Sequence, residues 1–214
     1  MINFVQLIIS LNALAPASPK RMRTVLNEPS AAWFGHALVL VIMLGSFSEP
    51  GFVKTKINNN IVLLLPEEFQ VMTAQDVTEK VVTPRQSIAL YTNPERRVNF
   101  SINQSSTSWE DSDLDLMKDF YKSSLMSLFS EIEFIREDIE IIKGREFAVF
   151  EFISIVRDQR SSVSSTGRSV KRYNYIQYTL VDSKTIVFSF SAPAVERNRW
   201  SGPARTIMSS VKIK

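Results

Sequence analysis

The sequence contains no cysteine and one histidine, His36, among its 214 residues. Without cysteine the chain forms no disulfide, thiol nucleophile, or cysteine-ligated zinc or iron–sulfur site. Because His36 precedes the main body, residues 49–214 also lack the imidazole of a Ser-His-Asp triad or of the usual zinc and copper sites. Neither G-x-G-x-x-G nor G-x-x-x-x-G-K-[ST] occurs, which excludes those phosphate-binding loops. We therefore predict no enzyme, no catalytic residue, no metal and no cofactor.

Glycine and proline are also scarce, with 6 and 9 residues, while 44% of the chain is hydrophobic and 22% is charged. These fractions are typical of a globular protein and exclude a disordered, collagen-like or multi-span membrane chain. The length fits one ordinary domain with a tail. Residues 49–214 carry 22 basic and 21 acidic groups, so their net charge is only +1. Such a balance gives little attraction to nucleic acid, which we exclude as a partner.

The first 48 residues differ from the rest and predict a leader. Lys20, Arg21 and Arg23 form a basic cluster, and an apolar run follows at residues 31–47. Basic residues before a short apolar run and small residues are typical of an export signal. We therefore predict a periplasmic or otherwise extracytoplasmic protein. Three alternatives remain: a single-pass membrane tether through residues 31–47, a buried core helix over the same residues, and translation from Met22.

The remaining sequence predicts a linker at 49–56 and a single α+β domain at 57–214. Apolar residues alternating with polar ones predict strands at 57–65, 86–92, 97–104, 146–156, 173–181 and 185–191. After Ser130 the same two-residue period returns at Ile132, Phe134, Ile139 and Ile141. Leu114, Met117, Tyr121, Leu125 and Leu128 recur every three or four residues, which predicts a helix with one apolar face. A second helix is expected over 195–210, followed by Val211–Ile213. We expect a central antiparallel β-sheet flanked by helices.

Three short segments of this domain resemble a known family. They are LLLPEEF at 63–69, IKGREFA at 142–148 and IMSSVKI at 207–213. Together with the capped helix after the first hairpin, they are similar to the PsbP/DcrB-like superfamily, whose members include a photosystem II extrinsic subunit, periplasmic DcrB-type lipoproteins and a Ran-binding nuclear-import factor. The resemblance spans residues 58–214 and implies an α/β/α sandwich in a binding or assembly protein. It supplies no catalytic residue, and the lipidation cysteine of DcrB-type members is missing.

A basic, serine-rich segment joins the last two long strands and is our candidate partner surface. Only one acid, Asp158, lies among its cations, and tyrosines follow directly. Basic side chains beside aromatic ones suit an acidic protein or an anionic envelope component. The alternative is a solvated hairpin connection. The predicted partner-binding residues are Arg157, Arg160, Arg168, Lys171, Arg172, Tyr173 and Tyr175.

Two acidic groups have structural interpretations that we prefer to catalytic or metal sites. Asp111, Asp113 and Asp115 match the first ligands of a calcium loop, but Leu116 and Lys122 occupy its glycine and glutamate positions. We therefore expect acids that cap a helix. The acids at 131–140 alternate with apolar residues and predict the solvated face of a strand instead of a glycosidase carboxylate pair.

These observations favour a non-catalytic, exported binding or assembly protein of the bacterial envelope, with a protein or envelope component as its partner. The first alternative is a cytoplasmic, chaperone-like adaptor that binds an apolar peptide or lipid on its sheet. It requires an exposed apolar sheet face. The more remote alternative is a carboxylate-dependent hydrolase, which requires two acids facing each other in a pocket.

Overall fold

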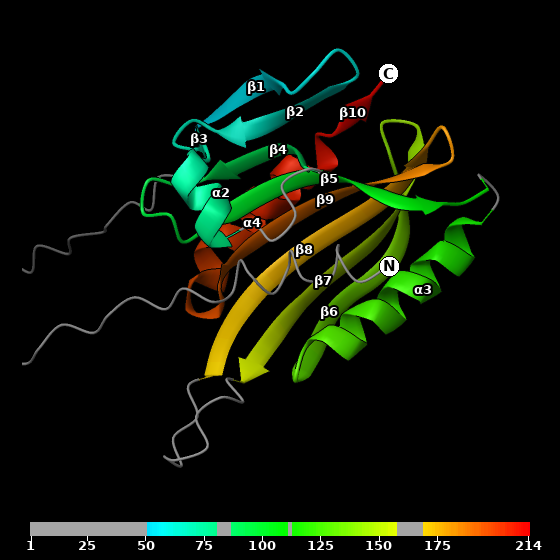
Figure 1. Cartoon of the computed structure of the whole chain (residues 1–214). Coiled ribbons are helices and arrows are strands. Elements are labelled where there is room, and N and C mark those ends of the chain that lie inside the picture. Colours follow the sequence, from blue (N-terminus) through cyan, green and yellow to red (C-terminus); the bar gives the residue numbers. More distant parts are fainter. Residues whose placement is uncertain (1–50, 81–86, 111–112, 158–168) are drawn as a thin grey trace, which may run out of the picture. The chain divides into compact units, whose positions relative to one another are not determined.

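The structure, a computed structural model, describes residues 51–80, 87–110, 113–157 and 169–214. These residues form two antiparallel sheets with three α-helices and a short 3₁₀ helix (Figure 1). The predicted leader, including the apolar run at 31–47, lies outside the described residues. None of the described helices is long and apolar enough to cross a membrane.

The larger sheet has seven strands in the order β3-β4-β5-β9-β8-β7-β6. All of its neighbours pair antiparallel. Its strands are β3 (Gln70–Val71), β4 (Ser87–Thr92), β5 (Asn99–Ser108), β6 (Glu131–Ile142), β7 (Arg145–Arg157), β8 (Ser169–Val181) and β9 (Lys184–Pro193). The predicted central antiparallel sheet and both predicted hairpins, β4–β5 and β8–β9, are confirmed.

Tight turns with left-handed residues set the register of the long hairpins. Lys143 and Gly144 connect β6 to β7 with φ of 51° and 83°, and Asp182 and Ser183 connect β8 to β9 with φ of 51° and 61°. Two consecutive residues at positive φ are typical of the hairpin turn whose twist matches that of the strands. Each pair of strands therefore begins its ladder directly after the turn.

The smaller sheet has the order β1-β2-β10 and brings both ends of the domain together. Its strands are β1 (Phe52–Lys56), β2 (Ile61–Pro66) and β10 (Lys212–Ile213). The predicted linker at 49–56 therefore contains a strand, because Phe52–Lys56 pair in register with β2. The predicted strand at 57–65 begins later, at Ile61, since the Asn58 carboxamide accepts hydrogen bonds from the amides of Asn60 and Ile61 and closes a turn.

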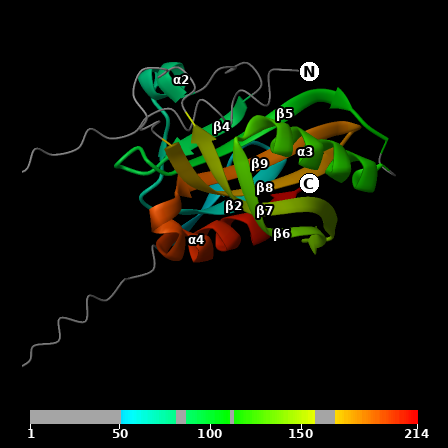
Figure 2. The same cartoon turned by 90° about the horizontal axis from the view of Figure 1, so that it is seen from below.

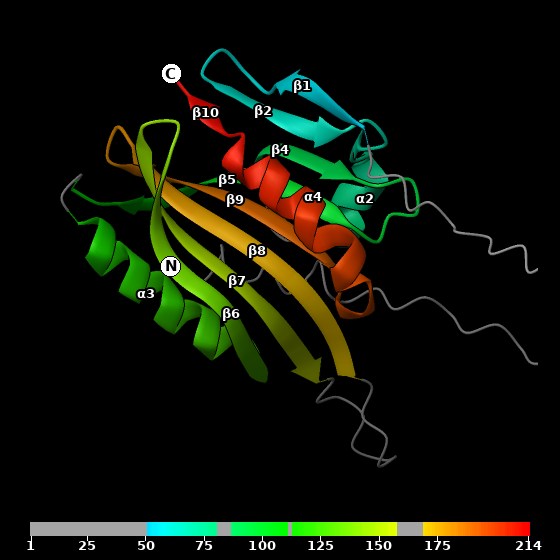
Figure 3. The same cartoon turned by 180° about the vertical axis from the view of Figure 1, so that it is seen from behind.

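The helices lie on both faces of the larger sheet. α3 (Leu114–Leu128) packs on one face, and α4 (Arg197–Ser209), preceded by the 3₁₀ helix η2 (Ala194–Glu196), packs on the other (Figures 2 and 3). The predicted apolar face of α3 is buried, as expected. A further short helix, α2 (Ala74–Lys80), follows β3 in a stretch to which the sequence analysis assigned no element.

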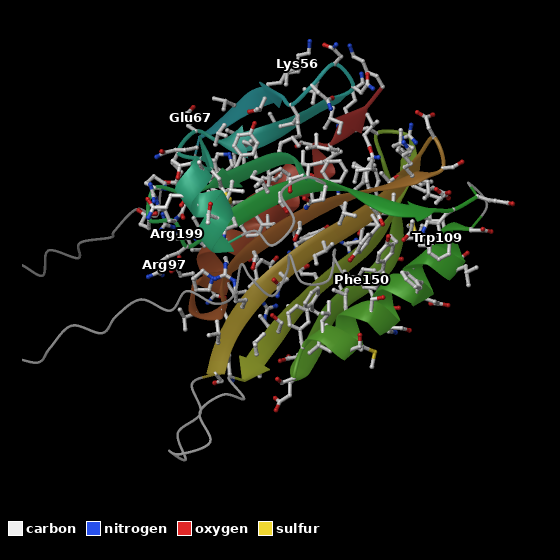
Figure 4. The ribbon with its side chains drawn as sticks, in the orientation of Figure 1. Lys56, Glu67, Arg97, Trp109, Phe150 and Arg199 are labelled. Carbon is white, nitrogen blue, oxygen red and sulfur yellow. The ribbon has the colours of Figure 1, made fainter. Side chains whose placement is uncertain are left out.

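The apolar core consists of two clusters, one on each face of the larger sheet. Beneath α3, Phe150 of β7 (labelled in Figure 4) belongs to a cluster that also includes Phe152 of β7 and Met117 and Tyr121 of the helix. On the other face, α4 contributes Trp200 to a cluster that also includes β2 of the smaller sheet. The α+β class, with helices flanking a central sheet, is therefore confirmed.

Candidate functional site

The predicted partner-binding residues divide into three groups in the structure. Arg160 and Arg168 lie outside the described residues, and only the backbone of Arg157, the last residue of β7, is described. Lys171 is exposed on β8. The side chains of Arg172, Tyr173 and Tyr175 are 6%, 0% and 3% exposed. The sequence predicted these three side chains on the contact surface, whereas the structure buries them.

Tyr173 belongs to a polar contact that attaches α4 to the sheet. Its hydroxyl donates a hydrogen bond of 2.9 Å to Glu151 Oε1, and Arg205 of α4 lies 3.1 Å from both carboxylate oxygens. Glu151 is fully buried, so this paired geometry compensates its charge. Burial, and then the neighbouring carboxylate, raises the pKa of Tyr173 far above its usual value. The hydrogen bond and charge of Glu151 raise the pKa of Arg205.

Tyr175 occupies the same sheet face two residues further along β8. Its pKa is raised mainly by burial. It is part of the apolar cluster beneath α4 and β2. The side chains of Tyr173 and Tyr175 are therefore part of the core, although the sequence analysis placed them on the contact surface beside the basic segment.

Arg172 lies on the opposite sheet face, because successive strand residues point to opposite sides. Its Nε donates a 2.8 Å hydrogen bond to Ser191 Oγ, and Nη2 donates a 2.9 Å bond to the carbonyl of Arg97. Burial, and secondly the charge of Arg97, lowers the pKa of Arg172 to about 10. Among the described residues no carboxylate forms an ion pair with Arg172. Glu196 pairs with the neighbouring Arg97.

Polar side chains continue from Arg172 across the sheet. Ser191 Oγ donates to Asn174 Oδ1 over 3.0 Å, and Asn174 Nδ2 donates to Ser154 Oγ over 2.9 Å. Asn99 of β5 lies opposite Ser191 in register. Its Oδ1 is buried without a hydrogen-bond partner. We call these five residues, Arg172, Ser191, Asn174, Ser154 and Asn99, the Arg172 cluster.

The acids of β6 pair with separate cations. Glu137 contacts Lys122 of α3 at 2.7 Å, and Glu140 pairs with Arg136 on its own strand. These contacts fit the solvated strand predicted from the sequence. Asp111 lies outside the described residues, whereas Asp113 and Asp115 lie at the start of α3. No group of three or more metal-ligating side chains occurs in the described part of the chain.

A cavity of about 440 Å³ lies at the turn end of the larger sheet. Its lining includes Arg145, Glu146, Asp182 and Lys214. Arg145 already donates a 2.8 Å hydrogen bond to the Leu180 carbonyl. The lining of this partly open cavity therefore carries charges of both signs.

Comparison with known proteins identifies the fold. No family model matches this chain, and no curated protein matches it. The Ran-binding protein Mog1p of Saccharomyces cerevisiae shares 11% identity over 77% of this chain and 96% of its own, with a TM-score of 0.50. Cyanobacterial PsbP (CyanoP) of Synechocystis shares 14% over 76% and 92%, with a TM-score of 0.49. LpqN of Mycobacterium tuberculosis shares 8% over 77% and 91%, with a TM-score of 0.40.

At such identities the likeness concerns the fold alone. The match to Mog1p covers nearly all of that protein, and a Ran-binding member was part of the resemblance noted in the sequence. The chain therefore shares the fold of Mog1p, an α+β fold of the kind that the resemblance of its three short segments implied.

Proposed function

We propose that this chain is a non-catalytic binding or assembly protein that acts outside the cytoplasm and contacts an acidic protein or envelope component at the end of the sheet where β7 and β8 meet. One observation carries the proposal: Arg157 and Ser169 are partners in the β7–β8 register. Both ends of the basic segment are thus attached to the same end of the long hairpin. Lys171, two residues further along β8, is exposed beside it.

The charge of this segment is not balanced within the sequence. Four cations, Arg157, Arg160, Arg168 and Lys171, accompany the single acid Asp158. Since a cluster of one sign favours partners of the opposite sign, we expect an acidic surface on the partner. Arg172, which is buried, is excluded from this contact surface.

The fold supports a binding role over the two alternatives. Mog1p, which has the same fold, is named as a Ran-binding protein, so at least one such fold acts by binding another protein. The adaptor alternative needs an open apolar sheet face, whereas the apolar clusters of both faces pack beneath α3 and α4. The hydrolase alternative needs two facing carboxylates, whereas the buried carboxylate of Glu151 is held by Arg205 and Tyr173.

The experiment is affinity capture from envelope extracts with the natively produced protein as bait. We expect a variant with Arg157, Arg160, Arg168 and Lys171 changed to Ser to lose the partner, and recovery to fall as salt rises because the contact is electrostatic. A variant with Lys54, Lys56, Lys143 and Lys212 changed to Ser removes the same charge elsewhere on the described surface and serves as the control. Equal recovery by all three baits would exclude the basic segment as the contact.

A further inference from the structure

We propose that the outer face of the smaller sheet docks on an anionic lipid surface. This face, which we call the lysine face, consists of Lys54 and Lys56 of β1, Val62 and Leu64 of β2, and Lys212 of β10. It lies on a different sheet from β7 and β8, which hold the ends of the basic segment. The lysine face is therefore a second contact, beyond the proposed function.

The register of the smaller sheet brings three lysines onto one face. Val62 pairs with Lys56 on one side and with Lys212 on the other. Leu64, two residues further along β2, pairs with Lys54. Because directly paired residues of antiparallel strands point to the same side of a sheet, all five side chains share one face. Neighbouring strands are about 4.8 Å apart, so the backbones of Lys56 and Lys212 are about 10 Å apart with Val62 between them.

β2 is apolar on both of its faces, although only one of them faces the core. Ile61, Leu63 and Leu65 are buried in the core cluster to which α4 also contributes. Val62 and Leu64 point the opposite way, are half-buried, and neither belong to that cluster nor pack against it. A strand with water on one side alternates apolar and polar residues, whereas a continuous apolar run is typical of a strand covered on both faces. The outer side chains of β2 therefore favour a second apolar contact.

The lysine face is accessible from outside the domain. Figures 1 and 3 both show the smaller sheet at the outside of the domain, with no described helix beyond it. Lys54, Lys56 and Lys212 are exposed, and Figure 4 shows Lys56 pointing away from the molecule. A partner that approaches from this side meets the lysine ammonium groups first.

The positive charge of this face is not balanced by the described residues. No ion pair within residues 51–80, 87–110, 113–157 and 169–214 includes Lys54, Lys56 or Lys212. The acids that follow β2, Glu67 and Glu68, come after the end of the strand that is farther from these paired lysines at Val62. Cations gathered around apolar side chains attract a surface that is both anionic and apolar.

A lipid surface fits the lysine face better than an acidic protein does. The ammonium of lysine is a point charge on a flexible stem, so it selects charge without a fixed geometry. The planar fork of arginine, which matches a carboxylate in detail, is absent from these five residues. At a bilayer surface the lysine stems would lie along the interface while the ammonium groups contact anionic headgroups. Val62 and Leu64 would then face the lipid, which gives β2 the apolar contact that its outer side chains lack.

The test is co-sedimentation of the natively produced protein with lipid vesicles at low ionic strength. One kind of vesicle contains equal parts of phosphatidylglycerol and phosphatidylcholine, and the other contains phosphatidylcholine alone. We expect binding to the anionic vesicles that weakens as salt is added, and weaker binding to the neutral vesicles. A lysine near an anionic surface contributes about 5-fold in affinity, so changing both Lys56 and Lys212 to Ser should weaken binding about 30-fold.

Lys143→Ser combined with Lys184→Ser is the matched control. It removes the same charge from two exposed positions at the hairpin turns of the larger sheet, and binding should stay within about 2-fold of the unaltered protein. Val62→Thr keeps every lysine and nearly the same volume, and it should weaken binding about 2- to 4-fold because it removes apolar contact. All variants keep residues 1–50, so any binding by the apolar run at 31–47 is common to them and is measured with the neutral vesicles. Melting temperatures verify that each variant is folded.

A further variant separates the lysine face from the basic segment. In protein with Arg157, Arg160, Arg168 and Lys171 changed to Ser, the additional change of Lys56 and Lys212 to Ser should again weaken vesicle binding about 30-fold. Equal weakening by the two lysine double variants, or equal binding to both kinds of vesicle, would overturn the proposal. Unchanged vesicle binding after loss of Lys56 and Lys212 would also overturn it and would leave an acidic protein as the occupant of this face. None of these outcomes decides the capture experiment, in which the bait that lacks Lys54, Lys56 and Lys212 is expected to retain the protein partner.

Discussion

Tyr173 shows how one buried hydroxyl links stability to pH. In the folded chain it donates to Glu151 within a fully buried contact, and its pKa lies far above the ordinary value of 10. The pKa of Tyr178, stacked on Tyr121 beneath α3, is also raised by burial. When the folded pKa of an acid is raised, the unfolded chain releases the proton first, so stability falls with pH above the unfolded pKa.

We therefore expect the free energy of unfolding to decrease above pH 10, by about 1.4 kcal/mol per pH unit for each of these two tyrosines. Tyr173→Phe should make this decrease shallower by about that amount per unit, because the variant has no proton to lose at this position. Denaturant titrations from pH 9 to 11 measure the slope. Tyr91→Phe serves as the comparison, because burial also raises the pKa of this half-buried tyrosine but no carboxylate adds to the effect. An unchanged slope in Tyr173→Phe would show that Tyr173 ionises normally in the folded chain.

The individual residues of the candidate site were only partly predictable from the sequence. Arg172 is adjacent to Lys171 and has the same charge, yet one side chain is buried and the other is exposed. The sequence pattern began the strand at Tyr173, whereas β8 begins at Ser169. With the strand extended backwards, Arg172 and Asn174 point to one face and Tyr173 to the other. The type of a polar residue does not indicate which face of a strand it occupies. The hydrogen bond from Arg172 to Ser191 could therefore be found only in the structure.

At the scale of the elements, β1 is the clearest departure from the pattern of the sequence. Two lysines in five residues resemble a solvated linker, but β1 is an edge strand and leaves them exposed. Phe52, at its start, packs against the core beneath α4. The helix α3, in contrast, was predictable because its apolar spacing extends over four turns and needs no long-range partner to be recognised.

Phe52→Ala tests whether β1 contributes to the folded domain. We expect a loss of about 1–3 kcal/mol of unfolding free energy, less than for a fully buried phenylalanine since Phe52 is half-buried. Val53→Ala changes the adjacent residue, which is 44% exposed, and should cost less than about 0.5 kcal/mol. Urea titration of both variants gives the comparison. Equal values for the two would mean that the segment behaves as the linker first predicted.

For the molecule as a whole, the sequence predicted the fold more fully than the activity. Short structural segments and alternating strands identified the PsbP/DcrB-like arrangement, and the fold is shared with Mog1p at 11% identity. Burial patterns persist at such distances because many different sequences keep the same alternation of apolar and polar residues. A partner or ligand is selected by a few side chains, and these leave no periodic signal.

The proposed export makes a prediction about the mature chain. We expect N-terminal sequencing of the natively produced protein, after cell fractionation, to find it in the extracytoplasmic fraction with residues up to about 48 removed, as an export signal is cleaved after its small residues. Strand β1 begins at Phe52, so this cleavage would keep the smaller sheet complete. Recovery of an uncleaved chain from the cytoplasm would contradict export.

The position of β10 has a consequence for the timing of folding. β2 is made early in synthesis, but one of its two edges is matched only by Lys212 and Ile213. A nascent chain on the ribosome thus cannot close the smaller sheet until those last residues have emerged.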